Sequence, residues 1–125
     1  MKVLKDPVQA LQVMDAKIDE LRNSRKKLFT EAEGKEASVI SGQETAIIRI
    51  AVYIRHAIKH HGCFGAEDMA CVHKYADDAK EEANKYYSNP RVNWFVKGLA
   101  EGAAWACVGI EVRMEERGEV GRPRQ

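Results

Sequence analysis

The chain has 125 residues, of which 45% are hydrophobic and 31% charged, with 20 basic and 19 acidic side chains. This length supports one hydrophobic core, so we expect a single domain. Because the charges almost cancel, there is no overall electrostatic case for nucleic acid, which is not an expected partner. Three cysteines cannot close a disulfide framework, and no apolar leader follows Met1. These features predict a cytoplasmic protein in a reducing environment.

The first predicted helix spans residues 6–33. Asp6 is a suitable N-cap, Pro7 fits the first helical turn, and Gly34 is expected to end the helix. An apolar seam with a period of about 3.5 residues runs along this segment. It comprises Leu4, Leu11, Met14, Ile18, Leu21 and Leu28. Leu11, Ile18 and Leu21 therefore form a predicted interface, either with a helix of the same chain, which we favour, or with a second subunit.

A polar linker is predicted over residues 34–41, and a second helix over residues 42–61. Ser41 and Glu44 have the spacing of a capping box at the start of this helix. Residues 47–55 keep helical spacing, but they also alternate as a β-strand would, so an α+β fold is the alternative. We favour the helix because the apolar period continues past ordinary strand length.

The third and fourth helices are predicted over residues 66–87 and 91–117, with a break at Pro90 between them. The third follows a turn that is bracketed by Gly62 and Gly65.

The fourth predicted helix is apolar nearly all the way round, so we expect it to be central and covered on every side. Trp105 and Val108 lie outside its core-facing stripe. Gly98, Gly102 and Ala106 recur every four residues and form a ridge without bulky side chains, on which another helix can pack closely. We expect this ridge to belong to an interface between subunits.

Two charges interrupt the apolar run of the fourth helix. Lys97 and Glu101 stand four residues apart, close enough to pair, and they argue against a membrane-spanning helix. A buried pair of this kind needs further hydrogen bonds to offset its desolvation. With Trp105, these residues are candidates for a ligand pocket between subunits. The alternative is that both charges emerge on the least buried strip of the helix.

All four histidines and two of the three cysteines fall between residues 56 and 73. His56, His60, Cys63 and Cys71 are candidate zinc ligands across a helical hairpin. Their spacing matches no standard zinc motif, and histidines at a helix end also suit the negative end of the dipole. We therefore expect no cofactor, with zinc at this cluster as the alternative.

Two charged clusters have a functional and a simpler interpretation. Acidic residues of the third helix suggest the carboxylates of magnesium-dependent nucleotide hydrolases, but a solvated face explains them more simply. Arg22 and Arg25 belong to a basic patch that suits weak phosphate contact or a solvated helix end. Because phosphate-binding loops and nucleophile motifs are absent from the sequence, we predict that the protein is not an enzyme.

Residues 99–110 read Leu-Ala-Glu-Gly-Ala-Ala-Trp-Ala-Cys-Val-Gly-Ile. This stretch resembles the last helix of small all-helical phage proteins that assemble as oligomers and sequester cyclic-nucleotide immune signals. The resemblance covers 12 of 125 residues through the pattern Leu-x-Glu-small-x-x-Trp-Ala-x-x-small-Ile. It implies a ligand held between subunits, a role in blocking host defence, and no catalysis. The ligand-contacting residues of that family lie outside the stretch, so none is transferred.

Together these patterns predict an all-α fold, an antiparallel bundle of about four helices over residues 1–117, with a flexible tail over residues 118–125. For function we expect a non-enzymatic interaction protein, an inhibitor or adaptor of phage or bacterial accessory type. The alternatives are an oligomer that sequesters a nucleotide signal and a metal-dependent nucleotide hydrolase. The expected partners are a second copy of the chain and either another protein or a small nucleotide ligand, and a membrane is not expected.

Overall fold

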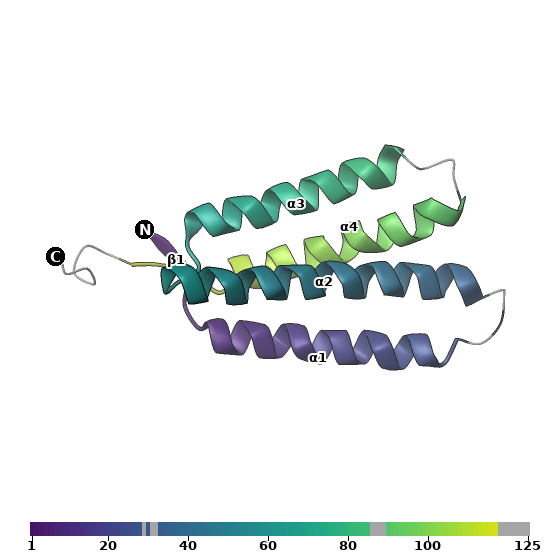
Figure 1. Cartoon of the computed structure of the whole chain (residues 1–125), viewed down its shortest axis with the longest axis horizontal. Coiled ribbons are helices and arrows are strands. Elements are labelled where there is room, and N and C mark those ends of the chain that lie inside the picture. The colour runs from purple at the N-terminus through teal and green to yellow at the C-terminus, as the bar shows by residue number, and fades with distance from the viewer. Residues whose placement is uncertain (29, 31–32, 86–89, 118–125) are drawn as a thin grey trace.

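The computed structural model describes residues 1–28, 30, 33–85 and 90–117. Its elements, in chain order, are β1 (Lys2–Leu4), α1 (Pro7–Lys26), α2 (Gly34–His61), α3 (Ala66–Lys85), α4 (Pro90–Glu111) and β2 (Met114–Glu116). The four helices pack side by side (Figure 1), so the predicted all-α bundle is confirmed. Residues 47–55 lie within α2, and the alternative of a strand is therefore wrong.

Successive helices run in opposite directions, so α2 and α4 run in the same direction (Figure 1). These two helices make the most extensive contact of the bundle. Helix α1 packs mainly on α2, and α3 packs mainly on α4. The backbones of α1 and α4, and those of α2 and α3, approach each other at few points.

Glycines explain why α2 and α4 approach so closely. A side-chain carbon added to Gly42 would lie 2.1 Å from the carbonyl oxygen of Phe95. One added to Gly98 would lie 2.0 Å from the carbonyl oxygen of Val39. Both distances are far below van der Waals contact, so the two backbones touch where only glycine fits.

The predicted small-residue ridge is therefore used inside the chain. Gly98 and Gly102 are buried against α2, and Ala106 is fully buried in the core. The expectation that these residues form an interface between subunits is wrong, because a helix of the same chain already occupies the ridge.

The apolar seam of the first helix also packs within the chain. Ile18 and Leu21 are buried in the core, and Leu11 packs against it half-buried. The preference for packing within the chain is confirmed for these three residues. Leu4 is buried as well, but it belongs to β1 and not to the helix.

The junction between the first and second helices differs from the prediction. Helix α1 ends at Lys26, and α2 begins at Gly34, where a polar linker was expected. Residues 34–41 are helical because Val39 packs on Gly98 and Ile40 is buried. The predicted capping box at Ser41 is wrong, since this residue lies inside α2 and its carbonyl accepts a hydrogen bond from Thr45.

The predicted turn before the third helix is present. Gly62 adopts a left-handed backbone conformation, with φ of 80°, and ends α2. Helix α3 ends at Lys85, and the rest of its predicted span falls outside the described residues. The same holds for the predicted tail over residues 118–125.

Helix α4 ends at Glu111, six residues before the predicted end, because the chain then forms a small antiparallel sheet. Strand β2 pairs with β1 in the register Lys2 with Glu116 and Leu4 with Met114. The backbone N–H of Leu4 also donates to the carbonyl of Phe64, at 2.8 Å. Local pattern could not reveal β1, since its hydrogen-bonding partners are about 60 and 110 residues away.

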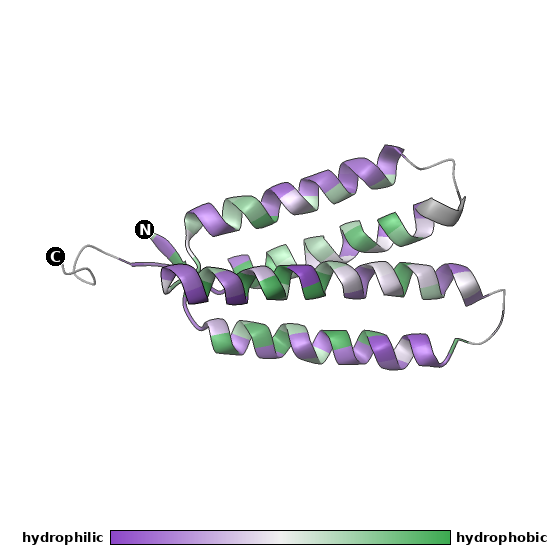
Figure 2. Cartoon of the chain, viewed as in Figure 1, coloured by the Kyte–Doolittle hydropathy of each residue, from purple (hydrophilic) through white to green (hydrophobic). Residues whose placement is uncertain are grey.

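Helix α4 is apolar along most of its visible length, whereas α3 is largely hydrophilic (Figure 2). Within the chain α4 is not covered on every side, contrary to expectation: Lys97, Glu101 and Ala104 are exposed, and Val108 is 63% exposed. This flank stays open because α1 leans on α2 and barely touches α4. None of the described helices combines the length and apolarity needed to cross a bilayer.

Candidate functional site

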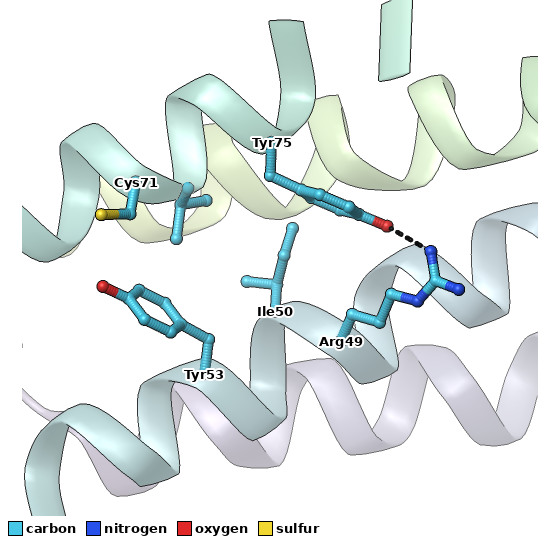
Figure 3. A pocket seen from close by; sticks show the side chains of 6 residues that line it. Arg49, Ile50, Tyr53, Cys71 and Tyr75 are labelled. Atoms are coloured by element: carbon cyan, nitrogen blue, oxygen red, sulfur yellow. Dashed lines mark hydrogen bonds between the residues drawn. The ribbon is translucent and has the colours of Figure 1, made fainter. Parts of the chain in front are cut away.

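An apolar groove runs between α2 and α3 (Figure 3). Arg49, Ile50 and Tyr53 of α2 form one wall, and the other wall comes from α3. The α3 residues are Cys71, Val72 and Tyr75. The groove encloses about 290 Å³. It exists because the glycine contact draws α2 towards α4 while α3 follows α4, so the backbones of α2 and α3 approach each other at few points.

Tyr53 is fixed at one end of this α2–α3 groove. Its hydroxyl donates to Oδ1 of Asp68, at 3.2 Å, and its ring meets Phe64 edge to face, with 6.2 Å between centroids. Oδ2 of Asp68 accepts from the backbone N–H of Gly65, at 2.9 Å, which caps the start of α3. The pKa of Tyr53 is raised, mainly by a hydrogen bond with Cys71 and to a smaller extent by burial and by the charge of Asp68. The hydroxyl of Tyr53 therefore stays protonated at neutral pH and lines the groove as a hydrogen-bonding group.

Arg49 and Tyr75 define the other end of the groove. Nη1 of Arg49 donates to the hydroxyl oxygen of Tyr75, at 3.3 Å (Figure 3). Among the described residues, the tyrosine hydrogen and the remaining guanidinium hydrogens have no hydrogen-bond acceptor, so they can donate to a bound group. This end of the groove therefore presents hydrogen-bond donors and a positive charge beside an apolar surface.

The groove has the chemistry of a binding surface. Its lining is mostly apolar, and its polar groups are one guanidinium, two tyrosine hydroxyls and a thiol. Tyrosine and arginine are the residue types that dominate binding energy at protein interfaces. Sequence reasoning missed this site because it depends on which helices face each other. The available signal was weak: Arg49 with Tyr53, and Cys71 with Tyr75, each four residues apart.

Among the described residues, the predicted ligand residues Lys97, Glu101 and Trp105 each contact a different neighbour. Within the described part of the chain, Lys97 and Glu101 do not pair with each other. The ammonium of Lys97 lies 5.4 Å from the ring centre of Trp94, and Glu101 accepts from Nε2 of Gln43 at 3.0 Å. Trp105 is half-buried, and the ammonium of Lys17, from α1, lies 5.7 Å from the centre of its ring.

The predicted zinc ligands are only partly brought together. The rings of His56 and His60 lie with centroids 4.2 Å apart, but Cys71 lines the groove beside Tyr53, and Cys63 is half-buried in the turn before α3. Over the residues that the structure describes, no three His, Cys, Asp or Glu side chains are placed to hold a metal ion. A four-ligand zinc site is therefore not assembled from these residues.

The acidic residues of α3 and α4 do not converge either. Asp78 pairs with Lys74 on its own helix, at 3.1 Å, and Glu111 of α4 pairs with His73 of α3, at 2.9 Å. These contacts fit the interpretation of solvated, locally paired charges better than a magnesium site.

Two residues of the basic patch have a structural role. Arg22 and Arg25 of α1 both bind the carboxylate of Glu44, which is only 7% exposed. Nε of Arg22 lies 2.7 Å from Oε1, and Nη2 of Arg25 lies 3.0 Å from Oε2. These contacts fix the register of α1 on α2. These contacts favour a structural role for the two arginines over the phosphate-binding interpretation.

A scan against protein-family models and searches of curated proteins and solved structures found no match to this chain. The resemblance of residues 99–110 to phage signal-sequestering proteins stays a prediction.

Proposed function

We propose that this protein is a non-enzymatic interaction protein that binds an amphipathic helix of a partner in its α2–α3 groove. The observation that carries the proposal is the groove itself, an apolar surface with Arg49 and Tyr75 at one end. Two antiparallel helices form its walls, and such grooves commonly receive the apolar face of a third helix.

The open shape of the groove favours a side chain of a partner over a cofactor. Pockets for small-molecule ligands enclose most of the ligand. The α2–α3 groove has a volume of about 290 Å³ and is open along its side. One or two apolar side chains of a partner, lying over the buried Ile50 and Val72, would suit this space.

The charge of α2 favours an acidic partner. Between residues 45 and 61 this helix carries Arg49, Arg55, Lys59 and three histidines, but no acidic residue. Arg49 lies at the groove and, among the described residues, only its Nη1 forms a hydrogen bond, so a carboxylate one helical turn from the apolar anchor would complement it. The proposed partner segment therefore combines a large apolar residue with an Asp or Glu three or four residues away.

Native mass spectrometry of the tagged chain recovered from its source cells tests the proposal. Wild-type protein is compared with Arg49→Glu, which reverses the groove charge, and with Cys71→Trp, which fills the groove from an exposed position. Lys59→Glu is the matched control, because it makes the same charge change on α2 outside the groove lining. Circular dichroism checks that all variants keep their helices.

We expect a bound protein in the wild type and in Lys59→Glu that is lost from both groove variants. A peptide of its acidic amphipathic segment should then bind the wild type and lose affinity when its carboxylate is replaced. A partner that both groove variants retain would contradict the proposal. Recovery of the chain without a partner protein would also count against it, and a retained nucleotide would favour the sequestering alternative.

The alternative of a ligand-sequestering oligomer has less support. Lys97, Glu101 and Trp105 each contact a different neighbour, and the glycine ridge expected between subunits packs within the chain.

A further inference from the structure

Two exposed histidines lie one turn apart on α2. The imidazole rings of His56 and His60 lie next to each other, with centroids 4.2 Å apart and planes tilted by 43°. Neither ring forms a hydrogen bond or ion pair with a residue that the structure describes. We propose that His56 and His60 together chelate one divalent transition-metal ion, with Cu²⁺ the preferred metal.

The geometry of the helix supports this chelate. Residues four apart lie on the same face of a helix, so both rings can direct a nitrogen towards one ion. The helix backbone already holds the rings side by side, which lowers the entropy cost of bringing two ligands together. Because both side chains are exposed, ion binding requires little desolvation of the protein.

The donor atoms determine the class of metal. Neutral imidazole nitrogens suit Cu²⁺, Ni²⁺ and Zn²⁺, and the general order of affinity places Cu²⁺ highest. Mg²⁺ and Ca²⁺ require oxygen ligands, which are absent from this pair. Two protein ligands leave the other coordination positions to water or to a donor from a partner. The site is thus smaller and more open than the four-ligand zinc site that the sequence suggested.

The other two histidines are not equivalent to this pair. His61 follows His60 directly, so its side chain leaves the helix about 100° further round. Nε2 of His73 contacts Glu111 on α4, at 2.9 Å. His61 therefore provides a matched control, with the same side chain on the same helix turn but outside the chelate.

Isothermal titration calorimetry of the full chain with CuCl₂, NiCl₂, ZnCl₂ and MgCl₂ tests the proposal. A Cys63→Ser, Cys71→Ser background removes the two accessible thiols, which would otherwise react with copper. We expect one Cu²⁺ per chain, weaker Ni²⁺ and Zn²⁺ binding, and no Mg²⁺ binding. His56→Ala and His60→Ala should each lower the Cu²⁺ affinity by about ten-fold or more, and His61→Ala should leave it unchanged.

Electron paramagnetic resonance of the copper complex provides a second measurement. The spectrum should show coupling to two imidazole nitrogens in the background protein and in His61→Ala, and to fewer in His56→Ala. Unchanged copper affinity in both His56→Ala and His60→Ala would overturn the proposal. An equal loss in His61→Ala would also overturn it, because it would indicate nonspecific binding to surface imidazoles.

Discussion

Gly42 of α2 and Gly98 of α4 lie in direct backbone contact, since a side-chain carbon added to Gly42 would lie 2.9 Å from the Cα atom of Gly98. In an up-and-down bundle, α2 and α4 are the diagonal pair and are ordinarily separated by side chains. Here the glycines allow the backbones of α2 and α4 to come into contact across this diagonal. The α2–α3 groove lies beside that contact.

Replacing Gly98 with alanine should therefore destabilise the fold. The added carbon would meet the backbone of Val39, which cannot move aside as a flexible side chain could. Overpacking of this kind costs about 1–3 kcal/mol, which exceeds the gain of up to about 1 kcal/mol from replacing a helical glycine with alanine. Urea denaturation of Gly98→Ala should show a lower midpoint than wild type.

Gly109→Ala is the control for this prediction. Gly109 also lies in α4, but the nearest atom to an added carbon is a guanidinium nitrogen of Arg113, at 3.8 Å. Its substitution should be neutral or stabilising. Equal stability of Gly98→Ala and Gly109→Ala would show that the helices have room to separate at no cost.

Features of the fold could be predicted from the sequence where the interacting residues lie close together along the chain, and not where they lie far apart. The start of α1 was predictable because Asp6 caps the backbone N–H of Gln9, only three residues away. The small-residue ridge was visible as a period, but its partner was misassigned, since nothing in the ridge shows whether a helix of the same chain or of another covers it. The groove at Arg49 and Tyr75 was missed because it joins residues that lie 26 positions apart, on two helices whose backbones approach each other at few points.

The role of Glu44 could not be read from the sequence for the same reason. Its spacing from Ser41 matched a capping box, but its carboxylate binds Arg22 and Arg25, which lie 22 and 19 residues earlier. A helix-capping motif and a buried helix–helix ion pair use the same residue type. Only the packing of α1 on α2 distinguishes them.

Substitution of Glu44 by alanine should weaken the contact between α1 and α2. The change leaves Arg22 and Arg25 without their common acceptor, but both guanidinium groups are partly exposed and water can solvate them. The expected cost is therefore about 1–3 kcal/mol, less than for a fully buried ion pair. Glu20→Ala removes an exposed pair with Lys17 and should cost less than about 1 kcal/mol in the same urea titration. Equal effects would show that Glu44 has no special role.

A substitution at Leu4 tests whether β1 contributes to the stability of the fold. The residue is 2% exposed, and its backbone N–H bonds to Phe64. Leu4→Ala should destabilise the protein by about 2–5 kcal/mol, the range for truncating a buried leucine. Val8→Ala, at a position that is 65% exposed in the first turn of α1, should change stability by less than about 0.5 kcal/mol. Thermal unfolding of both variants makes the comparison, and an equally mild effect at Leu4 would place β1 outside the cooperative core.

Cys107 should make the fold sensitive to alkaline pH. Burial, with smaller contributions from the charges of Glu111 and Asp77, raises the pKa of this thiol from 9.0 to about 11. The folded state therefore favours the neutral thiol, whereas the unfolded chain ionises at lower pH. The stabilising contribution is complete below about pH 9 and is lost as the pH rises towards 11. Its full size corresponds to about 2–3 kcal/mol.

Urea titrations at pH 8 and pH 10.5 measure this effect. The wild type should lose more stability between the two values than Cys107→Ala, which lacks the titrating group. Tyr53, whose pKa is also raised, is present in both proteins, so the difference between them isolates the thiol. Cys63→Ala, which removes a half-buried thiol in the turn before α3, should follow the wild type. If Cys107→Ala also follows the wild type, the thiol reaches solvent and the interior around Val72 and Ile110 is less closed than its burial indicates.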